Sequence, residues 1–312
     1  MKRLSGLTKI ASVGAVLALT GCIELTPPTP PQARPATLHP SQPSAQSRAL
    51  ATYYGRLQAD LVAQGLLRTD GGGPDTPFSA DILARNFERI AFFDEYERGA
   101  GLRVSRGTSG VLRRWSGPVR FSVEFGQFTP AEIRNKDRAA ITKYAQRLNR
   151  LTEHAISVRD QGANFHVLIA SEDDRAQTLT RVRQIVPNIN PASLQIIQNI
   201  PRSIHCMVLA FSDVDNDHDY AKAIAIIRAE HPDLVRLSCI HEELAQGLGL
   251  ANDSPNARPS IFNDDDEFAL LTTHDEMLLR MLYDPRLRAG MTVDEARPII
   301  RQIAIELTGG SS

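Results

Sequence analysis

Two adjacent glutamates and two amide side chains form the pattern in this sequence that is best suited to chemistry. The segment reads Glu242-Glu243-x-x-Gln246, and Asn252 follows after Gly249. On a helix, Glu242 and Gln246 share one face because they are four residues apart, whereas Glu243 points about 100° away. This layout offers Glu242 and Gln246 as ligands of a metal ion. A turn at Gly249 would add Asn252 as a third ligand, and Glu243 would be the general base that activates water.

The donor atoms of this candidate site restrict the metal that it could hold. One carboxylate and two amides supply only oxygen, which suits Ca²⁺, Mg²⁺ or Mn²⁺ better than Zn²⁺. A hard ion also polarises its bound water less than zinc does, so Glu243 would have to activate water almost alone. We therefore expect no cofactor or a weakly bound hard divalent metal, and no zinc.

The same helix carries an apolar stripe on another side, formed by Leu237, Ile240, Leu244 and Leu248. This stripe should pack against the core, because apolar residues at helical spacing mark the buried face of a helix. Glutamate and glutamine opposite such a stripe are also typical of any solvated helix face. The two glutamates alone therefore do not establish a site.

The order of motifs from Cys239 to Tyr283 resembles that of the metzincin zinc peptidases. Read from Glu242, E-E-x-x-Q-x-x-G-x-x-N aligns with the metzincin signature H-E-x-x-H-x-x-G-x-x-H, with every histidine replaced. Ser260-Ile-Phe262 resembles the Ser-Ile-Met of the Met-turn, with Phe262 in place of the methionine. Residues 272–283 resemble the helix that follows that turn. The resemblance implies an α+β, zincin-like domain with a small mixed sheet, a central motif helix and a helical C-terminal part.

The mature chain as a whole is similar to a bacterial family of secreted and lipid-anchored proteins. That family is catalogued only as a domain of unknown function, and its core motif is E-E-x-x-Q-x-L-G-L. The resemblance implies a degenerate metallopeptidase-like fold and brings no established activity or substrate.

Two histidines near the motif are weaker candidates for the site. His241 precedes Glu242 and would face away from Gln246, so a surface or supporting role is expected rather than metal ligation. His274 lies near the start of a predicted helix and could approach the cleft, although a structural role is the simpler interpretation. The remaining histidines have no metal-binding spacing.

Two acidic runs in the sequence resemble calcium sites in composition. Residues 213–219 begin like an EF-hand loop, but His218 stands at the obligatory glycine position and Ile224 at the glutamate position, which excludes an EF-hand. Residues 263–267 (Asn-Asp-Asp-Asp-Glu) should form a solvated loop at the rim of the cleft. Such a loop could repel acidic substrates or hold an ion weakly.

The first 21 residues predict a lipoprotein signal peptide. Lys2 and Arg3 precede an apolar segment, and Leu19-Thr-Gly-Cys22 resembles a lipobox, with Cys22 as the lipid-anchored residue. The apolar run is shorter than the roughly 20 residues that a membrane-spanning helix needs. By resemblance to other bacterial lipoproteins, Ile23 favours an outer-membrane location facing the periplasm. We therefore expect a membrane partner through the lipid anchor.

Cysteine usage fits an oxidising compartment. Once Cys22 carries lipid, Cys206 and Cys239 remain, and two cysteines in a periplasmic protein most simply form a disulfide. This bond would tie a predicted strand to the start of the motif helix. A catalytic thiol is the alternative, since Cys206 follows His205 and Cys239 lies near His241, but a reactive cysteine needs a thiolate-stabilising site.

The amino-acid composition divides the mature chain into a tether and a single domain. Residues 22–47 contain seven prolines and few large apolar residues, which predicts a lipid anchor followed by a semi-rigid tether. Residues 48–312 should form the zincin-like domain, with a helical N-terminal part over 48–112. Removal of residues 1–21 leaves 32 basic and 36 acidic residues, and this mildly acidic balance gives no footprint for nucleic acid.

The hydrophobic patterns predict both helices and strands in the domain. Strands are expected over 119–125, 165–170, 204–211 and 221–229. Helices are expected over 48–66, 79–97, 129–156, 232–249, 273–283 and 293–307.

These features predict a non-catalytic protein as the leading function. The cleft between the motif helix and the sheet would bind a peptide, an envelope protein or cell-wall material. The alternative is a hydrolase or peptidase of altered mechanism with Glu243 as its general base. A purely structural envelope component is the third interpretation.

Overall fold

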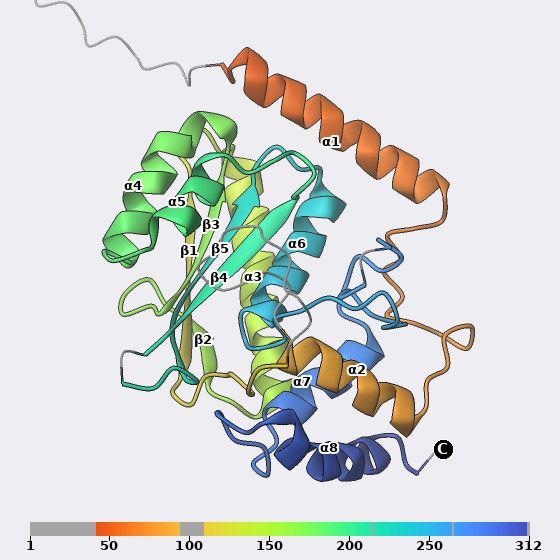
Figure 1. The fold of residues 1–312 in the computed structure, drawn as a ribbon. Helices are drawn as coiled ribbons and strands as arrows, with labels where there is room; N and C mark the ends of the chain where they lie inside the picture. Colours follow the sequence, from red (N-terminus) through yellow and green to blue (C-terminus); the bar gives the residue numbers. More distant parts are fainter. Residues whose placement is uncertain (1–41, 94–108, 214, 264, 311–312) are drawn as a thin grey trace, which may run out of the picture. The chain divides into compact units, whose positions relative to one another are not determined.

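The computed structural model describes residues 42–310 apart from 94–108, 214 and 264, and the domain lies within the unit Pro40–Ser312 (Figure 1). The predicted signal peptide 1–21 and Cys22 lie outside the described residues. The domain is α+β, and its elements run along the chain in this order: α1 (Ala45–Ala63), α2 (Ala80–Phe92), β1 (Val119–Phe125), α3 (Ala131–Thr152), β2 (Ile156–Val158), β3 (Phe165–Ala170), η1 (Glu172–Asp174), α4 (Arg175–Ile185), α5 (Pro191–Gln198), β4 (Cys206–Ser212), β5 (Tyr220–Arg228), α6 (Asp233–Gln246), α7 (Thr273–Leu282) and α8 (Val293–Leu307).

The five strands form one mixed sheet with the order β2-β1-β3-β5-β4. β1, β2, β3 and β5 run parallel, and β4 runs antiparallel to β5 at the edge. The short β5–α6 connection places the start of α6 beside the end of β5 and the start of β4. The expected mixed sheet is therefore confirmed, and its antiparallel edge strand lies next to the motif helix.

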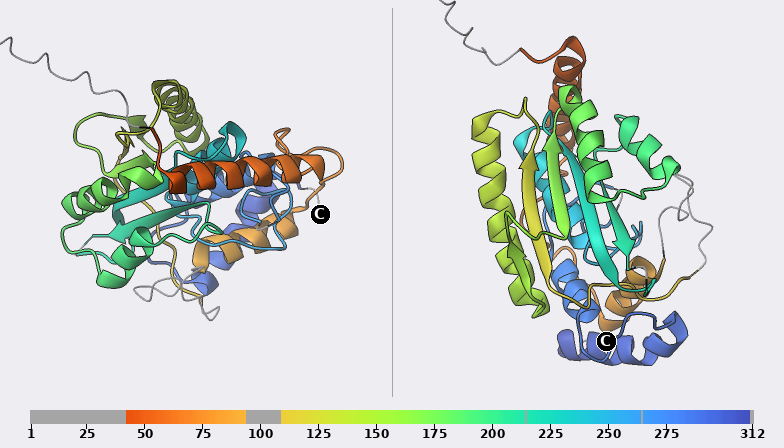
Figure 2. Two further views of the ribbon diagram at one scale, coloured as in Figure 1. Left: turned by 90° about the horizontal axis from the view of Figure 1, so that it is seen from above. Right: turned by 90° about the vertical axis from the view of Figure 1, so that its left-hand side faces the viewer.

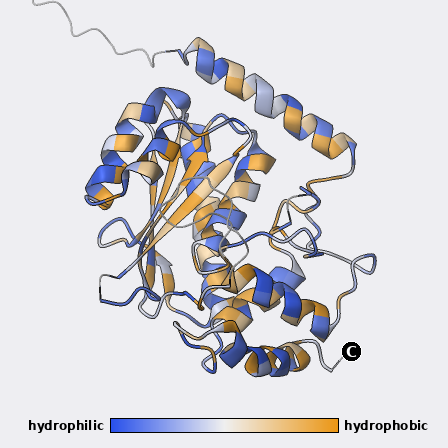
Figure 3. Ribbon diagram, viewed as in Figure 1, coloured by the Kyte–Doolittle hydropathy of each residue, from blue (hydrophilic) through white to orange (hydrophobic). Residues whose placement is uncertain are grey.

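Strand alternation divides the side chains between two cores. Phe121 and Phe165 face the larger core, which is covered by α3 and α6, whereas Leu168 and Ile224 face a smaller core with α4 and α5. Figure 2 shows these helix layers on the two sides of the sheet. The central strands are largely hydrophobic, as Figure 3 shows, because both of their faces are covered.

Helix α1 begins earlier than the sequence indicated. Ser44 caps it by accepting a hydrogen bond from the backbone N–H of Ser47, and the helix starts at Ala45, inside the predicted tether. Only Ser47 and Tyr54 of α1 are buried. The Ser47 hydroxyl donates to Glu230 (2.8 Å), and the Tyr54 hydroxyl donates to the carbonyl of Arg202 (2.9 Å). Polar contacts therefore fix this helix near the carboxyl end of β5.

Other boundaries also differ from the predictions. Helix α3 ends at Thr152 because Glu153 takes the left-handed conformation (φ 53°), and Ile156 begins β2 instead of ending the helix. Helices α4 and α5 occupy the 171–203 region, for which no helix was predicted. Helix α2 ends at Phe92, and the last predicted residues of that helix, 94–97, lie outside the described residues.

Within residues 42–310, apart from the gaps given above, the structure contains no helix that is long and apolar enough to span a membrane.

Candidate functional site

Helix α6 is anchored at its first turn by a buried ion pair. The Arg236 guanidinium is 1% exposed and donates to Asp137 of α3 (2.6 Å), to the carbonyl of His231 (2.6 Å) and to Asp233 (2.7 Å). Burial raises the pKa of Asp137, and Arg236 opposes this effect. Loss of one partner would leave a buried charge uncompensated. The pair therefore fixes the helix on α3.

The predicted disulfide is present and joins α6 to the edge strand. Cys206, the first residue of β4, bonds to Cys239 of α6 with a Cα–Cα distance of 5.8 Å, and the bond closes a loop with a sequence separation of 33 residues. It therefore holds the start of β4 against the middle of the motif helix. The bond also removes the thiols on which the catalytic-cysteine alternative depended.

The disulfide lies directly beside the motif glutamates. Atoms of Cys206, Glu242 and Glu243 lie within 4.8 Å of one another, and no other cluster of three or more His, Cys, Asp or Glu side chains with metal-binding spacing occurs among the described residues. Glu242 is partly exposed, whereas Glu243 is 3% exposed. We call Cys206, Glu242 and Glu243 the acidic corner. The sequence did not indicate that Cys206 would join the two glutamates.

The two amides proposed as metal ligands support the backbone and the loop after α6. The Gln246 amide donates to the Asp253 carboxylate (3.0 Å), and the buried Asn252 amide donates to the backbone carbonyl of Arg89 (3.1 Å). Because both partners are acceptors, the NH₂ group of each amide must face its partner. Asn252 is thereby tied to α2, and Gln246 is tied to the loop.

The end of α6 is shaped by close packing around two glycines. Helix α6 ends at Gln246, three residues before the predicted end at Gly249, and Gly249 has a φ of 133°, a conformation that favours glycine. A Cβ on Gly247 would lie 2.4 Å from the Phe165 ring, so only glycine fits there. The Trp115 indole donates to the carbonyl of Gly247 (2.8 Å), and the Tyr283 hydroxyl donates to that of Leu248 (2.9 Å). These contacts set the direction in which the chain leaves the motif helix.

The turn around Phe262 is fixed by one buried carboxylate. Asp275 of α7 is 0% exposed and accepts hydrogen bonds from the Ser260 hydroxyl (2.6 Å), the Ile261 N–H (3.0 Å), and the Thr272 N–H and hydroxyl (2.9 and 2.8 Å). Phe262 is buried in the larger core. We call Asp275 and its three partners the turn anchor. It links the segment that contains Phe262 to helix α7.

The two histidines near the motif are buried and pack in the interior of the domain. His241 stacks on Tyr144 (4.1 Å between ring centroids), its Nδ1 accepts a hydrogen bond from the Leu271 N–H, and burial lowers its pKa to about 3. His241 is therefore a neutral core residue. It does not lie on the surface, which was one of the two roles expected from the sequence. His274 is 0% exposed and contacts Asn86 (3.1 Å) and the Phe78 ring, as the structural interpretation requires.

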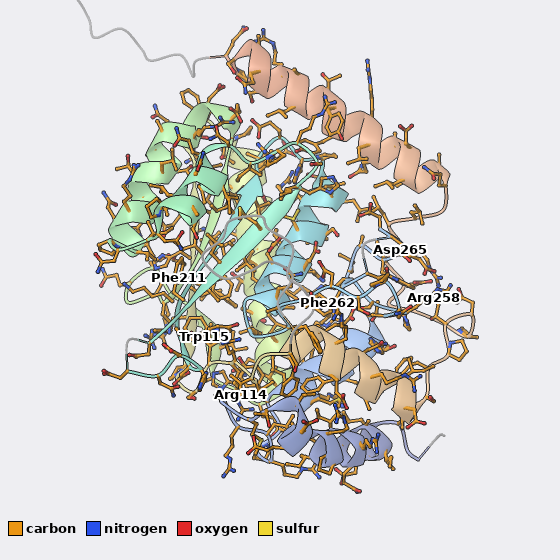
Figure 4. All side chains as sticks on the ribbon, in the orientation of Figure 1. Arg114, Trp115, Phe211, Arg258, Phe262 and Asp265 are labelled. Carbon is orange, nitrogen blue, oxygen red and sulfur yellow. A yellow bond between two sulfur atoms is a disulfide. The ribbon has the colours of Figure 1, made fainter. Side chains whose placement is uncertain are left out.

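The described residues of the acidic run 263–267 lie in a loop that ion pairs and hydrogen bonds hold in place, whereas a solvated loop was expected. Glu267 is paired with Arg258 and Arg68, and these guanidinium groups lower the pKa of its carboxyl. Asp265 remains exposed and accepts hydrogen bonds from Asn263 and from the Glu267 N–H. Figure 4 shows Arg258 and Asp265 on the outer part of this loop and Phe262 nearer to α6. Two arginines thus neutralise Glu267, the last residue of this acidic run.

A second polar group lies on the other face of the sheet. Ser122 and Glu124 of β1 and His166 of β3 contact one another at 2.9–3.0 Å, and Arg181 of α4 pairs with Glu124. Burial alone would raise the pKa of Glu124, but hydrogen bonds from His166, Arg181 and Ser122 outweigh burial and lower this pKa to about 2. Serine and glutamate share the same histidine nitrogen, so proton relay through the two ring nitrogens is not available. This cluster was not predicted, and it ties α4 to the sheet.

A small cavity of about 40 Å³ lies where β3 and β5 end. It is lined on one side by apolar residues of α5 and β5, and on the other by Arg228, Glu172 and Arg175. Glu172 already pairs with both arginines. Its size admits about one or two water molecules, so it offers no site for a larger ligand.

The donors in the acidic corner of the oxidised protein do not fit the zinc ion that a metzincin site would hold. A zinc site needs imidazole, thiolate or carboxylate ligands in tetrahedral positions. Here two carboxylates lie beside a disulfide sulfur, which carries no thiolate charge. The amides of Gln246 and Asn252 are already oriented by Asp253 and Arg89. In the oxidised protein this donor set does not suit zinc, and the expectation of no zinc stays a prediction.

Comparisons with known proteins give one finding at the level of the family. Neither a curated protein nor a solved structure matches the chain. A family model matches residues 80–302, which include the motif helix, the whole sheet and the turn anchor. The chain therefore belongs to the family described as a protein of unknown function, DUF2927.

Proposed function

We propose that this chain is a lipid-anchored protein of the bacterial envelope whose zincin-like domain binds an extended peptide segment without cleaving it. The segment would come from an envelope protein or from cell-wall material. The fold relationship to zincins rests on the order of sheet, motif helix, turn and C-terminal helix, together with the motif resemblance. Lipid attachment rests on the Leu19-to-Cys22 segment, and the outer-membrane location rests on Ile23 after the cysteine.

The proposal that the domain binds a peptide without cleaving it is supported by the state of the donor groups near Glu243. Gln246 and Asn252 are held by Asp253 and by the backbone of Arg89, and the sulfur beside the glutamates is oxidised. A water molecule near Glu243 would therefore have no strong Lewis acid to polarise it. Binding is the function that such a remodelled site can still perform.

The edge strand supports a peptide ligand. All seven residues of β4 are partly exposed, in contrast to the buried β5 beside it. Among the described residues, β4 pairs only with β5, so the structure assigns no strand to its outer edge. An extended peptide could add there through backbone hydrogen bonds, with its side chains entering the space near α6. The acidic corner would then lie at one end of the bound segment.

A peptide experiment separates this proposal from the hydrolase alternative. Random-sequence peptides selected on the full chain would be tested for binding and cleavage with the wild-type protein and Glu243→Gln. We expect both proteins to bind the same peptides and neither to cleave them. Backbone N-methylation of the peptide should abolish binding, because strand addition needs the peptide N–H groups.

Other outcomes of the same experiment have a clear meaning. Cleavage by the wild-type protein that is lost in Glu243→Gln would support a hydrolase with Glu243 as base. Binding that survives N-methylation at alternate residues would contradict strand addition. Failure to select any peptide would favour the structural-component interpretation.

The membrane attachment has its own test. Growth of the producing bacterium with radiolabelled palmitate should label the wild-type chain, and Cys22→Ser should remove the label. Retention of the label in Cys22→Ser would show that lipid attachment does not depend on Cys22.

A further inference from the structure

The sulfur of Cys206 is positioned as a ligand beside two carboxylates. Its Sγ and the carboxylate oxygens of Glu242 and Glu243 lie within 4.8 Å of one another. In a tetrahedral zinc site, a sulfur at about 2.3 Å and oxygens at about 2.0–2.2 Å from the metal lie roughly 3.5 Å apart. Contraction by about 1 Å would therefore bring the three groups of the acidic corner around one ion.

The oxidation state of Cys206 determines whether these groups suit zinc. A sulfur in a disulfide is a poor ligand, whereas a thiolate is among the preferred ligands of Zn²⁺. One thiolate and two carboxylates would make three anionic ligands and leave a fourth position for water. Only the reduced acidic corner therefore has a donor set that zinc prefers.

The surroundings of Cys239 can accommodate a thiol. His231 is 2% exposed, and burial holds its pKa well below the ordinary value, so its imidazole is neutral. Its Nδ1 lies 3.8 Å from the Cys239 sulfur, and its Nε2 has no hydrogen-bond partner among the described residues. A neutral imidazole has one acceptor nitrogen, and a disulfide sulfur has no proton to donate to it. In the tautomer that carries its proton on Nε2, the Nδ1 atom of His231 could accept a proton from a reduced Cys239.

We propose that reduction of the Cys206–Cys239 bond converts the acidic corner into a zinc site. A dithiol reductant would transfer two electrons and two protons, breaking the S–S bond, forming two thiols and itself becoming a disulfide. Cys206 is the accessible sulfur, because it is partly exposed while Cys239 is 2% exposed. Zn²⁺ then replaces the Cys206 thiol proton, which passes to solvent. Cys239 keeps its proton and donates it towards His231.

This inference does not depend on peptide binding. It assigns Glu243 as a ligand in the reduced state, instead of the general base of the hydrolase alternative. It also explains why the predicted ligands Gln246 and Asn252 are not required, since Cys206 replaces them as the third donor.

The two cysteines allow a matched test. The full chain would carry Cys22→Ser, so that Cys206 and Cys239 are the only cysteines. Cys239→Ser leaves the Cys206 thiol free without any reductant, whereas Cys206→Ser removes the ligand. Both variants lack the same disulfide, so any loss of stability is shared. Zinc affinity would be measured by competition with a chromophoric chelator, with circular dichroism to confirm that both variants are folded.

The expected result is one zinc ion per chain in Cys239→Ser and in the reduced parent, and none in Cys206→Ser or in the oxidised parent. In the Cys239→Ser background, Glu242→Gln and Glu243→Gln should each weaken zinc binding by more than the roughly 10- to 100-fold that loss of an outer-shell partner costs. Equal zinc binding by the Cys206→Ser and Cys239→Ser variants would overturn the proposal. Absence of zinc binding in folded Cys239→Ser would do the same.

Discussion

The turn anchor and the acidic corner are two acidic regions of one domain with opposite arrangements. Asp275 is fully buried and receives four hydrogen bonds from three residues within a short stretch of chain. Glu242 and Glu243 are instead adjacent to each other and to a disulfide that comes from a distant strand. A buried carboxylate surrounded by donors stabilises a fold. Two carboxylates placed side by side beside sulfur are better suited to a ligand.

The largest expected effect comes from breaking the turn anchor. Asp275→Ala removes the acceptor of four hydrogen bonds and leaves buried donors unsatisfied, so we expect a loss of about 4 kcal/mol in the free energy of unfolding. Urea denaturation would measure it. The exposed ion pair of Asp294 with Arg297 supplies the control, since Asp294→Ala should unfold at the same urea concentration as the wild type. An equally small effect of Asp275→Ala would show that the anchor does not stabilise the fold.

Removal of the disulfide should have the next largest effect. Cys239→Ser opens the loop between β4 and α6, and a loop of this length corresponds to about 3 to 4 kcal/mol in the chain-entropy account. The wild-type protein under reducing conditions should lose a similar amount in urea denaturation. No change in either case would mean that other contacts alone hold β4 against α6.

A smaller and gradual effect should appear with pH. Burial lowers the pKa of His241 to about 3 from an ordinary value of 6.5, so the unfolded chain binds the proton more readily than the folded one. The stabilisation is complete above pH 6.5 and falls by about 1.4 kcal/mol per pH unit as the pH drops from 6.5 towards 3. Urea denaturation between pH 7.5 and 5 would measure this slope.

The matched variant for this slope is His241→Phe, which keeps an aromatic ring against Tyr144. It should be less stable at pH 7.5, because the Leu271 N–H loses its acceptor. Its stability should nevertheless fall less steeply with pH than that of the wild type. An unchanged slope would show that other histidines, such as His231 and His205, whose pKa values are also lowered by burial, account for the whole effect.

The sequence predicted those parts of the fold that have strong local patterns. The alternation in residues 119–125 gave β1 with the bounds that the structure has, and Thr292 with Glu295 forms the capping box of α8. β2 was missed because three residues are too few to show alternation. Helix α4 was missed because its sequence is mostly polar, with only Leu179, Val182 and Ile185 buried. Local pattern therefore sufficed where an element has one clearly apolar face.

The candidate site was predictable only in part, for a similar reason. The spacing of Glu242, Glu243 and Gln246 is local, and the pairing of the last two cysteines follows from their number. The contact of Cys206 with the glutamates depends on β4 running antiparallel at the sheet edge, which no local pattern encodes. The hydrogen bond from Asn252 to Arg89 likewise joins residues 163 positions apart. Such distant contacts decide which donors remain for a ligand.

The most direct test of the account is the zinc content of the oxidised full chain. The protein and Glu242→Ala would be dialysed against zinc at neutral pH without reductant and analysed for bound metal. We expect no stoichiometric zinc in either protein, because the acidic corner lacks a thiolate while its disulfide is intact. One zinc ion per oxidised chain that is lost in Glu242→Ala would contradict it, and would support metal-dependent hydrolysis in place of binding.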